Sequence, residues 1–445
     1  MKAFSLLLQA RSPLAIRADH APAGFDCLDY LPGTSLAGSL ASLHRLLYPA
    51  QREEFRRLFL SGSVQFPDLL LAPLVVRNGS GTRQETPLSP VYPLPRTAQS
   101  CKRYPGFKSG NGPEASESGH GVYDTLFAWA AFALQSNDEP RAIKALQRQH
   151  LCKVCSAPME SIAGYYARQN GAFHLADYRG RRHLQTHTGI DRLRGTVQEE
   201  ILYNREVLEE GTCFWGLLKA ADEEAPLLQR FLEEAGHSGL VRIGTGRTRG
   251  LGAVELTLTP LQDPSLSLAG FRERLLTFDR RLRDYLTDYK IPEPCQGRKP
   301  FYFALTLYSP TILCDEFLRY RGRIDETTLA ELLGSPFTSN DVRCLHTAAA
   351  VCRVTGWNDL WGLPRPAEYA IERGSVFLFA YWERSDVDLD RLIEALFRLE
   401  EEGVGRRRNE GFGCIRVSDP FHFEVLDHEH KGQGYPGESA CDCCE

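Results

Sequence analysis

The sequence predicts an α+β protein built from two related units in tandem, and two repeated features support this. The chain opens twice with an apolar, alternating strand that runs into Ser-Pro, FSLLLQARSPLAI at 4–16 and FYFALTLYSPTIL at 301–313. It closes twice with a glycine- and arginine-rich loop before a last strand, GTGRTRGLG at 244–252 and GVGRRRNEGFG at 403–413. Alternation indicates strands, and a repeat of both ends in the same order indicates duplication.

The helices of the two units follow from apolar spacing. LPGTSLAGSLASLHRLL at 31–47 predicts a helix after the Pro-Gly break, with Thr34 or Ser35 as its cap. A second helix precedes each glycine loop, at 223–239 and 388–403, with leucine and phenylalanine at helical intervals. Strands and helices in this order predict a split β-α-β, ferredoxin-like fold for each unit.

The expected boundaries follow from this repeat and from changes in composition. We expect a first unit at 1–264, a helical bridge at 265–299, a second unit at 300–426 and a disordered tail at 427–445. An insertion at 88–160 interrupts the first unit. Its first part, 88–120, is rich in Pro, Gly and Ser and predicts an irregular segment, followed by a helix in VYDTLFAWAAFALQ at 122–135.

Composition narrows the class of protein. The 445 residues are 42% hydrophobic and 24% charged, and no stretch is apolar for long enough to span a membrane. The N-terminus predicts a strand and not a signal peptide, so we expect a cytoplasmic protein. The net charge of −5 argues against a globally basic protein, but arginines cluster locally, which is typical of a protein that binds one polyanion in a groove.

The glycine loops predict contacts to a sugar–phosphate backbone. Neither loop has the lysine of a phosphate-binding Walker loop, and a strand follows where a dinucleotide fingerprint needs a helix. Glycines allow close approach of a backbone, and arginines contact phosphates or stack on bases. An ordinary turn with solvated arginines is the alternative. The candidate residues of the two loops are Gly244, Gly246, Arg247, Arg249, Gly250, Gly252, Gly403, Gly405, Arg406, Arg407, Arg408, Gly411 and Gly413.

Two other segments carry candidate phosphate contacts. RGRRHLQTHTGIDRLRG at 179–195 predicts a β-hairpin with arginines along it, and its alternative is a charged, solvated hairpin. The helix that begins near Thr34 and Ser35 can offer its N-terminal amides. The candidate arginines of the hairpin are Arg181, Arg182, Arg192 and Arg194.

A zinc site is predicted in the insertion. The chain has 13 cysteines and no export signal, and in a reducing compartment cysteine pairs indicate metal more often than disulfides. Cys152 and Cys155 form a C-x-x-C knuckle that needs two more ligands. Cys101 and His120 bracket the Pro/Gly-rich segment, which a metal would hold together. His183 and His187 are the alternative pair.

The motifs together resemble those of the RAMP superfamily of CRISPR-associated proteins. LPGTSLAGSLA at 31–41 is similar to the family's helix start, 187–216 is similar to the hairpin region of type III members, and the two glycine loops complete the match. The resemblance implies RRM-like, ferredoxin-like units. Two such units in one chain resemble the type III-D effector subunit that caps the five-prime handle of the guide RNA. Its implied partners are guide RNA, other RAMP subunits and a large polymerase-like subunit.

The resemblance leaves catalysis open. Some family members cleave precursor RNA with a histidine, and some cut target RNA with an aspartate of the first strand–helix loop, so the candidates here are His44, Asp26 and Asp29. We favour a surface or interface role for His44, and neither aspartate matches the family's position securely. A non-catalytic RNA-binding subunit is therefore the prediction. The alternatives are an endoribonuclease that processes precursor guide RNA and a scaffold that contacts only proteins.

Overall fold

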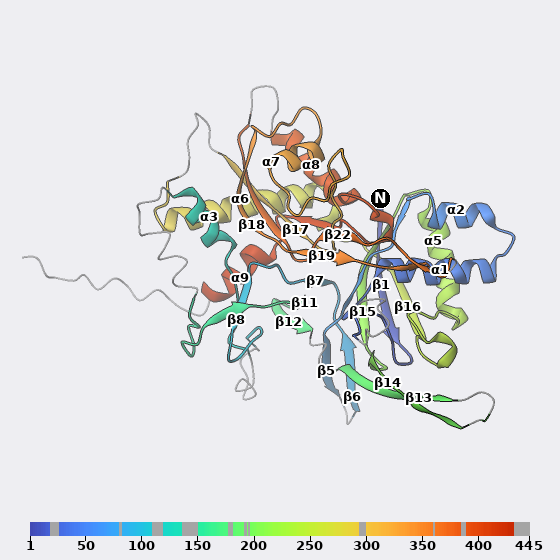
Figure 1. Ribbon diagram of the computed structural model, residues 1–445. Coiled ribbons are helices and arrows are strands. Elements are labelled where there is room, and N and C mark those ends of the chain that lie inside the picture. Colours follow the sequence, from blue (N-terminus) through green and yellow to red (C-terminus); the bar gives the residue numbers. More distant parts are fainter. Residues whose placement is uncertain are drawn as a thin grey trace, which may run out of the picture.

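The computed structural model describes residues 1–17, 26–79, 82–108, 119–135, 150–176, 181–190, 194, 196–292, 300–358, 361–383 and 389–430 (Figure 1). Two antiparallel sheets organise the molecule, each with helices packed on it. One sheet belongs to the N-terminal unit and the other to the C-terminal unit, and the insertion extends beside the second.

The first sheet has the order β16-β1-β15-β4-β2, with β3 also paired to β15. Side chains of β1 alternate between core and surface as predicted: Phe4, Leu6 and Leu8 enter the core, which α1, α2 and α5 cover. The elements are β1 (Lys2–Ala10), β2 (Tyr30–Leu31), α1 (Gly33–Leu47), α2 (Arg52–Phe59), β3 (Val64–Gln65), β4 (Leu69–Leu71), β15 (Cys213–Ala220), α5 (Ala225–Ser238) and β16 (Val254–Pro260).

The second sheet has the order β18-β23-β17-β24. Its first strand does not alternate as predicted, because every residue of β17 is buried. The helices α7 and α8 cover one face of this sheet, and α6 and α3 cover the other. The elements are α6 (Leu268–Asp288), β17 (Phe301–Leu307), α7 (Glu326–Leu333), β18 (Val342–Ala348), β23 (Val376–Tyr381), α8 (Leu389–Glu402) and β24 (Ile415–Val417).

The strand orders of the two sheets correspond. In each, the opening strand lies between the strand that precedes the glycine loop's helix and the strand that follows the loop: β1 between β15 and β16, and β17 between β23 and β24. All these pairs are antiparallel. Both glycine loops therefore join a surface helix to a strand beside the opening strand.

The insertion contains more regular structure than its composition predicted. Strands lie within 88–120, because distant segments supply their partners: β8 pairs with β9 and β10, and β7 pairs with β11. The segment 122–135 begins as a strand and only then becomes a helix. The elements are β7 (Val91–Pro93), β8 (Ala98–Cys101), β9 (Val122–Asp124), α3 (Leu126–Leu134), β10 (Met159–Ser161), β11 (Tyr165–Gln169) and β12 (Ala172–Ala176).

A helix is present where the helical bridge was expected, and Phe278, Leu282 and Leu286 of this α6 are buried against the second sheet. One other expectation needs correction. The expected disordered tail begins as helix, since α9 (Phe421–His430) extends beyond residue 427. Phe421 anchors α9, with its ring centroid 5.0 Å from that of Tyr166 in β11. The rest of the predicted tail, 431–445, lies outside the described residues.

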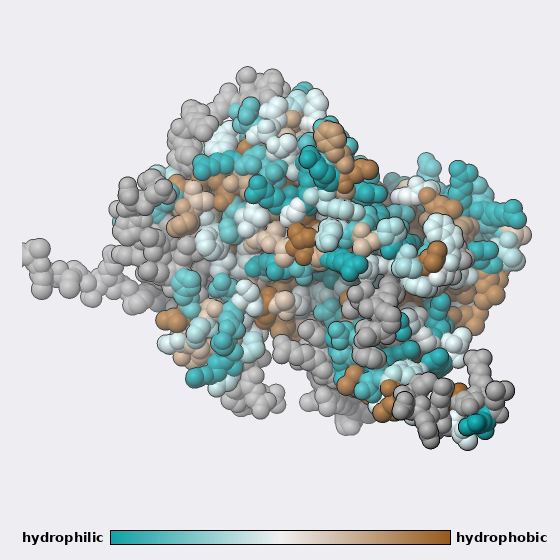
Figure 2. All heavy atoms as spheres, viewed as in Figure 1, coloured by the Kyte–Doolittle hydropathy of each residue, from teal (hydrophilic) through white to brown (hydrophobic). Residues whose placement is uncertain are grey.

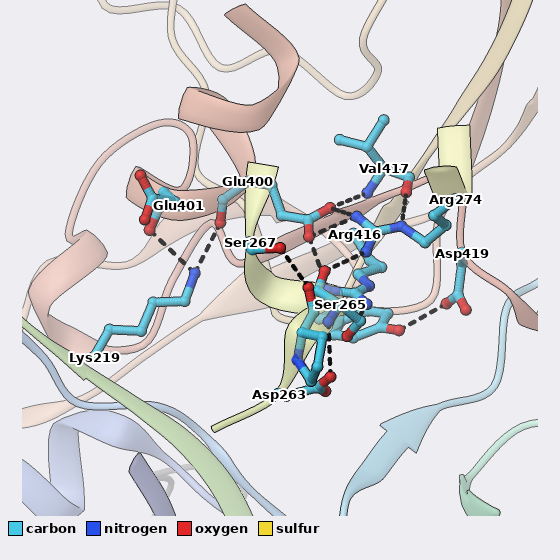
Figure 3. Close-up of polar contacts among 12 residues, drawn as sticks. Lys219, Asp263, Ser265, Ser267, Arg274, Glu400, Glu401, Arg416, Val417 and Asp419 are labelled. Atoms are coloured by element: carbon cyan, nitrogen blue, oxygen red, sulfur yellow. Dashed lines mark hydrogen bonds and ion pairs between the residues drawn. The ribbon is translucent and has the colours of Figure 1, made fainter. Parts of the chain in front are cut away.

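A polar cluster joins the two units (Figure 3). Lys219 of β15 donates to the carbonyl oxygens of Glu400 (2.8 Å) and Glu401 (3.0 Å) at the end of α8, where the helix dipole favours a cation. The buried Glu400 carboxylate accepts from Arg274 (2.7 Å) and Arg416 (2.8 Å). Burial alone would raise the pKa of Glu400, but the two guanidinium groups outweigh it and hold that pKa below its usual value.

The remaining elements project from this body. The hairpin of β13 (Arg182–Ile190) and β14 (Val197–Leu208) extends away from the first unit, beside β5 (Leu74–Gly79) and β6 (Thr82–Pro87) (Figure 1). On the second unit, β19 (Val351–Val354), β20 (Trp357–Asn358), β21 (Leu363–Pro364) and β22 (Glu368–Ile371) form two small ribbons. Apolar residues on the face in Figure 2 show in small groups among hydrophilic ones. No helix in the described part combines the length and apolar character that a membrane span needs.

A candidate RNA-binding groove and a metal cluster

The two glycine loops have the same backbone. In the first, the N–H groups of Thr245 and Gly252 donate to Ala15 and Pro13; in the second, those of Arg406 and Gly413 donate to Ile312 and Pro310. These four distances are 2.9 to 3.0 Å. The serine before each proline accepts from the residue after the last glycine, at 2.9 Å in both units (Ser12 with Ala253, Ser309 with Cys414). The repeated Ser-Pro is therefore part of the loop's anchor.

This hydrogen bonding corrects the register of the repeat. Matching the letters aligns Gly244 with Gly403, but the bonds make Gly244 equivalent to Gly405. A left-handed backbone occurs at equivalent places, with φ of 86° at Gly244 and 79° at Gly405. A Cβ on either glycine would lie within 2.6 Å of a carbonyl oxygen, so only glycine fits. In this register Arg407, with φ of 58°, occupies the place of Gly246, and Glu410 the place of Arg249.

The two loops therefore differ in charge. In the second loop, Arg407 pairs with Glu368 and Glu410, both at 2.7 Å. Arg406 lies 3.7 Å from Glu368, and Arg408 lies 3.5 Å from Glu402. In the first loop the position of Glu410 is taken by the exposed Arg249, which donates to the Tyr203 hydroxyl at 2.9 Å. The arginines of the second loop therefore lie beside carboxylates of β22, α8 and the loop itself, and the first loop has a cation where the second has a carboxylate.

A groove of about 1270 Å³ lies between the units and is lined by both glycine loops. The opening of α1, the first strand–helix loop, the insertion and the β19–β22 region also contribute to its walls. Among the described residues, nine arginines and four carboxylates line it, so its walls are strongly cationic although the chain is acidic. The arginines are Arg17, Arg45, Arg96, Arg242, Arg247, Arg353, Arg365, Arg373 and Arg407.

The start of α1 forms one wall of the groove. Thr34 and Ser35 line it, but Pro32 is the N-cap residue and neither predicted side chain caps the helix. The amide of Gly33 donates to Asp68 at 2.9 Å, so a carboxylate already occupies the first amide. A Cβ on Gly33 would lie 2.3 Å from the Phe66 carbonyl oxygen and 2.7 Å from that of Glu410. Glycine thus lets the helix start pack directly against the second loop.

The predicted hairpin is present, and its two long faces differ. Gln185, His187, Tyr203 and Arg205 are half-buried on one face, while Leu184, Ile190 and Leu202 are exposed on the other. His187 stacks on Tyr203 with ring centroids 5.2 Å apart.

Two of the candidate arginines of the hairpin already form ion pairs. Arg181 and Arg182 pair with Glu85 (3.1 Å) and Glu206 (3.0 Å). Arg194 is exposed near the tip, and Arg192 lies outside the described residues.

The groove also contains residues that sequence reasoning missed. On its second-unit wall, Arg353 and Trp357 are exposed on two short ribbons, and Arg365 pairs with Glu410 at 2.7 Å. Arg373 is buried, pairs with Asp68, and lies over the Tyr30 ring at 4.0 Å, so it joins the units across the groove floor. These arginines are isolated along the chain, and only the alternation of VCRV at 351–354 is a local signal.

The candidate catalytic residues are not brought together. His44 is 1% exposed among the rings of Phe55, Phe59 and Phe231, and both of its ring nitrogens lack a hydrogen-bond partner in the described structure. The expectation of a surface or interface histidine was therefore wrong, and burial lowers the pKa of His44. Asp29 lines the groove and accepts from Tyr165 at 3.1 Å, whereas Asp26 lines a separate, smaller cavity.

The predicted metal ligands converge at one end of the sheet β10-β8-β9. The ligand atoms of Cys101, His120, Cys152 and Cys155 all lie within 4.8 Å of one another. Cys101 Sγ is 3.5 Å from Cys155 Sγ, and Cys152 Sγ is 3.4 Å from His120 Nδ1. Bonds of about 2.3 Å to a tetrahedral ion imply ligand separations near 3.7 Å. The four side chains can hold a metal ion, and the alternative pair His183 and His187 is on the hairpin, apart from the knuckle.

The backbone around the cluster favours thiolates. Burial works against the charged form of Cys101 and Cys152, but backbone N–H donors from Tyr104 to the first and from Cys155 and Val154 to the second outweigh it. The pKa of each of these two thiols is therefore lowered. N–H groups directed at sulfur are the outer contacts expected around thiolate ligands.

A family model and several solved structures match this chain. No curated protein matches the chain. Similar solved structures include a chain of the Type III-B Cmr-beta bound to cognate target RNA and AMPPnP (12% identity, covering 84% of this chain and 86% of that one, TM-score 0.34). Others are oligomeric Cmr4 from Pyrococcus furiosus (17%, 58% and 99%, 0.27) and a Cas6 product complex (14%, 94% and 99%, 0.37). The family model of the RAMP superfamily matches residues 7–255, more than half of the sequence. The chain therefore belongs to the RAMP superfamily.

Proposed function

We propose that this protein is a non-catalytic subunit of a type III CRISPR effector complex that binds the five-prime handle of the guide RNA in antiviral defence. The cationic groove between the units carries this proposal. Its walls hold nine arginines against four carboxylates, and both glycine loops contribute to it. A single-stranded polyanion fits a groove of this charge, and exposed aromatic side chains such as Trp357 offer bases a surface to stack on.

Within the groove we assign the phosphate contacts chiefly to the first unit. Arg247 of the first loop is exposed and lines the groove with Thr34 and Ser35, and Arg249 is exposed on the same loop. In the second loop Arg406 and Arg408 remain half-exposed and add contacts at the edge, while Arg407 holds the loop through Glu368 and Glu410. Arg181, Arg182 and Arg194 lie along the hairpin and extend these contacts, and Arg192, outside the described residues, is proposed from the sequence alone.

Two structural proposals accompany this function. The matching strand orders and loop anchors support tandem ferredoxin-like units that arose by duplication. The cluster of three cysteines and one histidine supports structural zinc, which would hold together the strands of the insertion. Zinc would supply cross-links here and no chemistry on RNA.

The partners are proposed from the same features. Solved relatives carry the names of Cmr complexes, one with target RNA, and we infer that this chain likewise assembles with guide RNA, other RAMP subunits and a large polymerase-like subunit. The exposed Leu184, Ile190 and Leu202 on the projecting hairpin suit a protein contact better than water.

The test is binding of the full chain to end-labelled guide RNA with and without its five-prime handle, followed by a denaturing gel of the same samples. Handle-dependent binding with intact RNA is expected. Cut RNA would favour the endoribonuclease, and equal binding of both RNAs would overturn the assignment to the handle. If the chain binds neither RNA at low salt, the result would favour the alternative of a scaffold that contacts only proteins.

A further inference from the structure

A second, smaller cavity of about 170 Å³ lies against the first glycine loop. It is lined by Arg17 and Arg205, together with Tyr203 of the hairpin and Thr245 of the loop. Arg205 comes from β14, so the hairpin and the loop close this cavity together. It is distinct from the main groove, although Arg17 and Thr245 line both.

The Nη1 atom of Arg205 is buried and has no hydrogen-bond partner in the described structure. Burial is the main cause that lowers the pKa of Arg205, and Arg17 and Arg249 lower it further, while Tyr203 raises it. A buried guanidinium nitrogen without an acceptor is costly, and an anion is the ligand that would relieve the cost.

Comparison of the two loops shows why this space exists. A Cβ on Gly246 would lie 2.6 Å from Arg205 Nη1, so the glycine makes room for the arginine of the hairpin. The equivalent residue of the second loop is Arg407, whose own guanidinium pairs with Glu368 and Glu410. The first loop has Arg249 in place of Glu410. An arginine side chain therefore lies against this position in the first unit and occupies it in the second, but only the second loop supplies a carboxylate, Glu410, for its arginine.

Two carboxylates also line the cavity. Glu206 Oε2 already accepts from the Cys27 amide (2.7 Å) and from Arg182 (3.0 Å). Asp26 is the other carboxylate in the lining. Arg249 adjoins the cavity, because it donates to the hydroxyl of the lining Tyr203 at 2.9 Å. The guanidinium groups of Arg17 and Arg205 line the cavity with that hydroxyl, and together with Arg249 they offer donors for the oxygens of one phosphate.

We propose that this cavity binds one phosphate group, with Arg205 as its central donor and Arg17 and Arg249 beside it. The proposal deepens the RNA-binding function and rests on it only for the source of the phosphate, either a phosphodiester within the strand or a terminal phosphate. Among the described residues Arg407 of the second loop is already paired with Glu368 and Glu410, so the proposal does not extend to that loop.

The test compares guide-RNA binding of the full chain with that of Arg205→Gln, Arg249→Glu and the control Arg343→Gln, across a salt series. Arg343 is exposed on β18 and does not line either cavity. Loss of one phosphate contact is expected to weaken binding roughly tenfold and to reduce the log–log salt slope by about 0.7. Arg249→Glu gives the first loop the carboxylate that the second loop has at the equivalent position. Because Arg249 is exposed, this variant tests the cavity even if Arg205→Gln fails to fold.

Competition with small phosphate compounds shows whether the bound phosphate is internal or terminal in the RNA. A dinucleoside monophosphate that displaces RNA from the wild type but not from Arg249→Glu indicates an internal phosphodiester, and a nucleoside 5′-monophosphate that does so indicates a terminal phosphate. The proposal is overturned if both cavity variants bind RNA like the control. If the wild type binds no guide RNA, the proposed function fails, and phosphate binding by the cavity is then tested with inorganic phosphate at constant ionic strength. Inorganic phosphate should raise the melting temperature of the wild type but not that of Arg249→Glu.

Discussion

The charge of the groove predicts how strongly salt weakens RNA binding. Nine arginines and four carboxylates line it, a net of five positive charges among the described residues. Each phosphate neutralised on a single strand contributes about 0.7 to the slope of log affinity against log salt, so five predict a slope of about −3.5. A fourfold rise in salt should therefore weaken binding on the order of 100-fold.

The perturbation that isolates the groove is Arg45→Gln combined with Arg353→Gln. Both side chains are exposed, lie on opposite units, and have no acidic partner within the described residues. Removing both should make the slope shallower by about 1.4, and the exposed Arg343→Gln should leave it unchanged. Fluorescence anisotropy of labelled RNA across a salt series measures the slope for the wild type and for each variant. A wild-type slope shallower than about −1, or a double variant indistinguishable from the wild type, would refute the assignment of RNA to this groove.

Three further outcomes test the structure around the site. Glu400→Gln leaves Arg274 and Arg416 buried without a carboxylate and should cost about 3–5 kcal/mol in urea unfolding, whereas Glu401→Gln should not. Cys152→Ser should abolish bound zinc measured by elemental analysis, while Cys344→Ser, outside the cluster, retains it. Burial opposes protonation of His422, but Asp124 and Asp419 outweigh it and raise the pKa of His422 above about 6.5. Its contribution to stability is thus complete below about pH 6.5 and is lost as pH rises through the raised value; His422→Asn should remove that part of the pH dependence of the melting temperature.

Features that depend on neighbouring residues could be read from the sequence. The opening strands, the helices before the glycine loops and the loops themselves follow from periodicity and from glycine, because these signals act within a few residues. The predicted metal ligands lie together for a related reason. A C-x-x-C knuckle presents two thiolates to one ion, and a segment with little apolar content needs an external cross-link.

Features that depend on contacts between distant segments were decided only by the tertiary structure. The letters of the repeat aligned Gly244 with Gly403, and hydrogen bonds to the Ser-Pro segments set the register two residues later. The strands of 88–120 and the burial of β17 on both faces likewise depend on partners far along the chain.

Charge pairing was the other property hidden from the sequence. Both loops are rich in arginine, yet Arg407 has Glu368 and Glu410 as partners while Arg205 meets Arg17 and Arg249. A sequence lists charges in chain order, but the electrostatic energy of a guanidinium depends on the groups within a few ångströms of it and on its burial. The sequence therefore determined which residue types could contact a polyanion, and the fold determined which of them remain available.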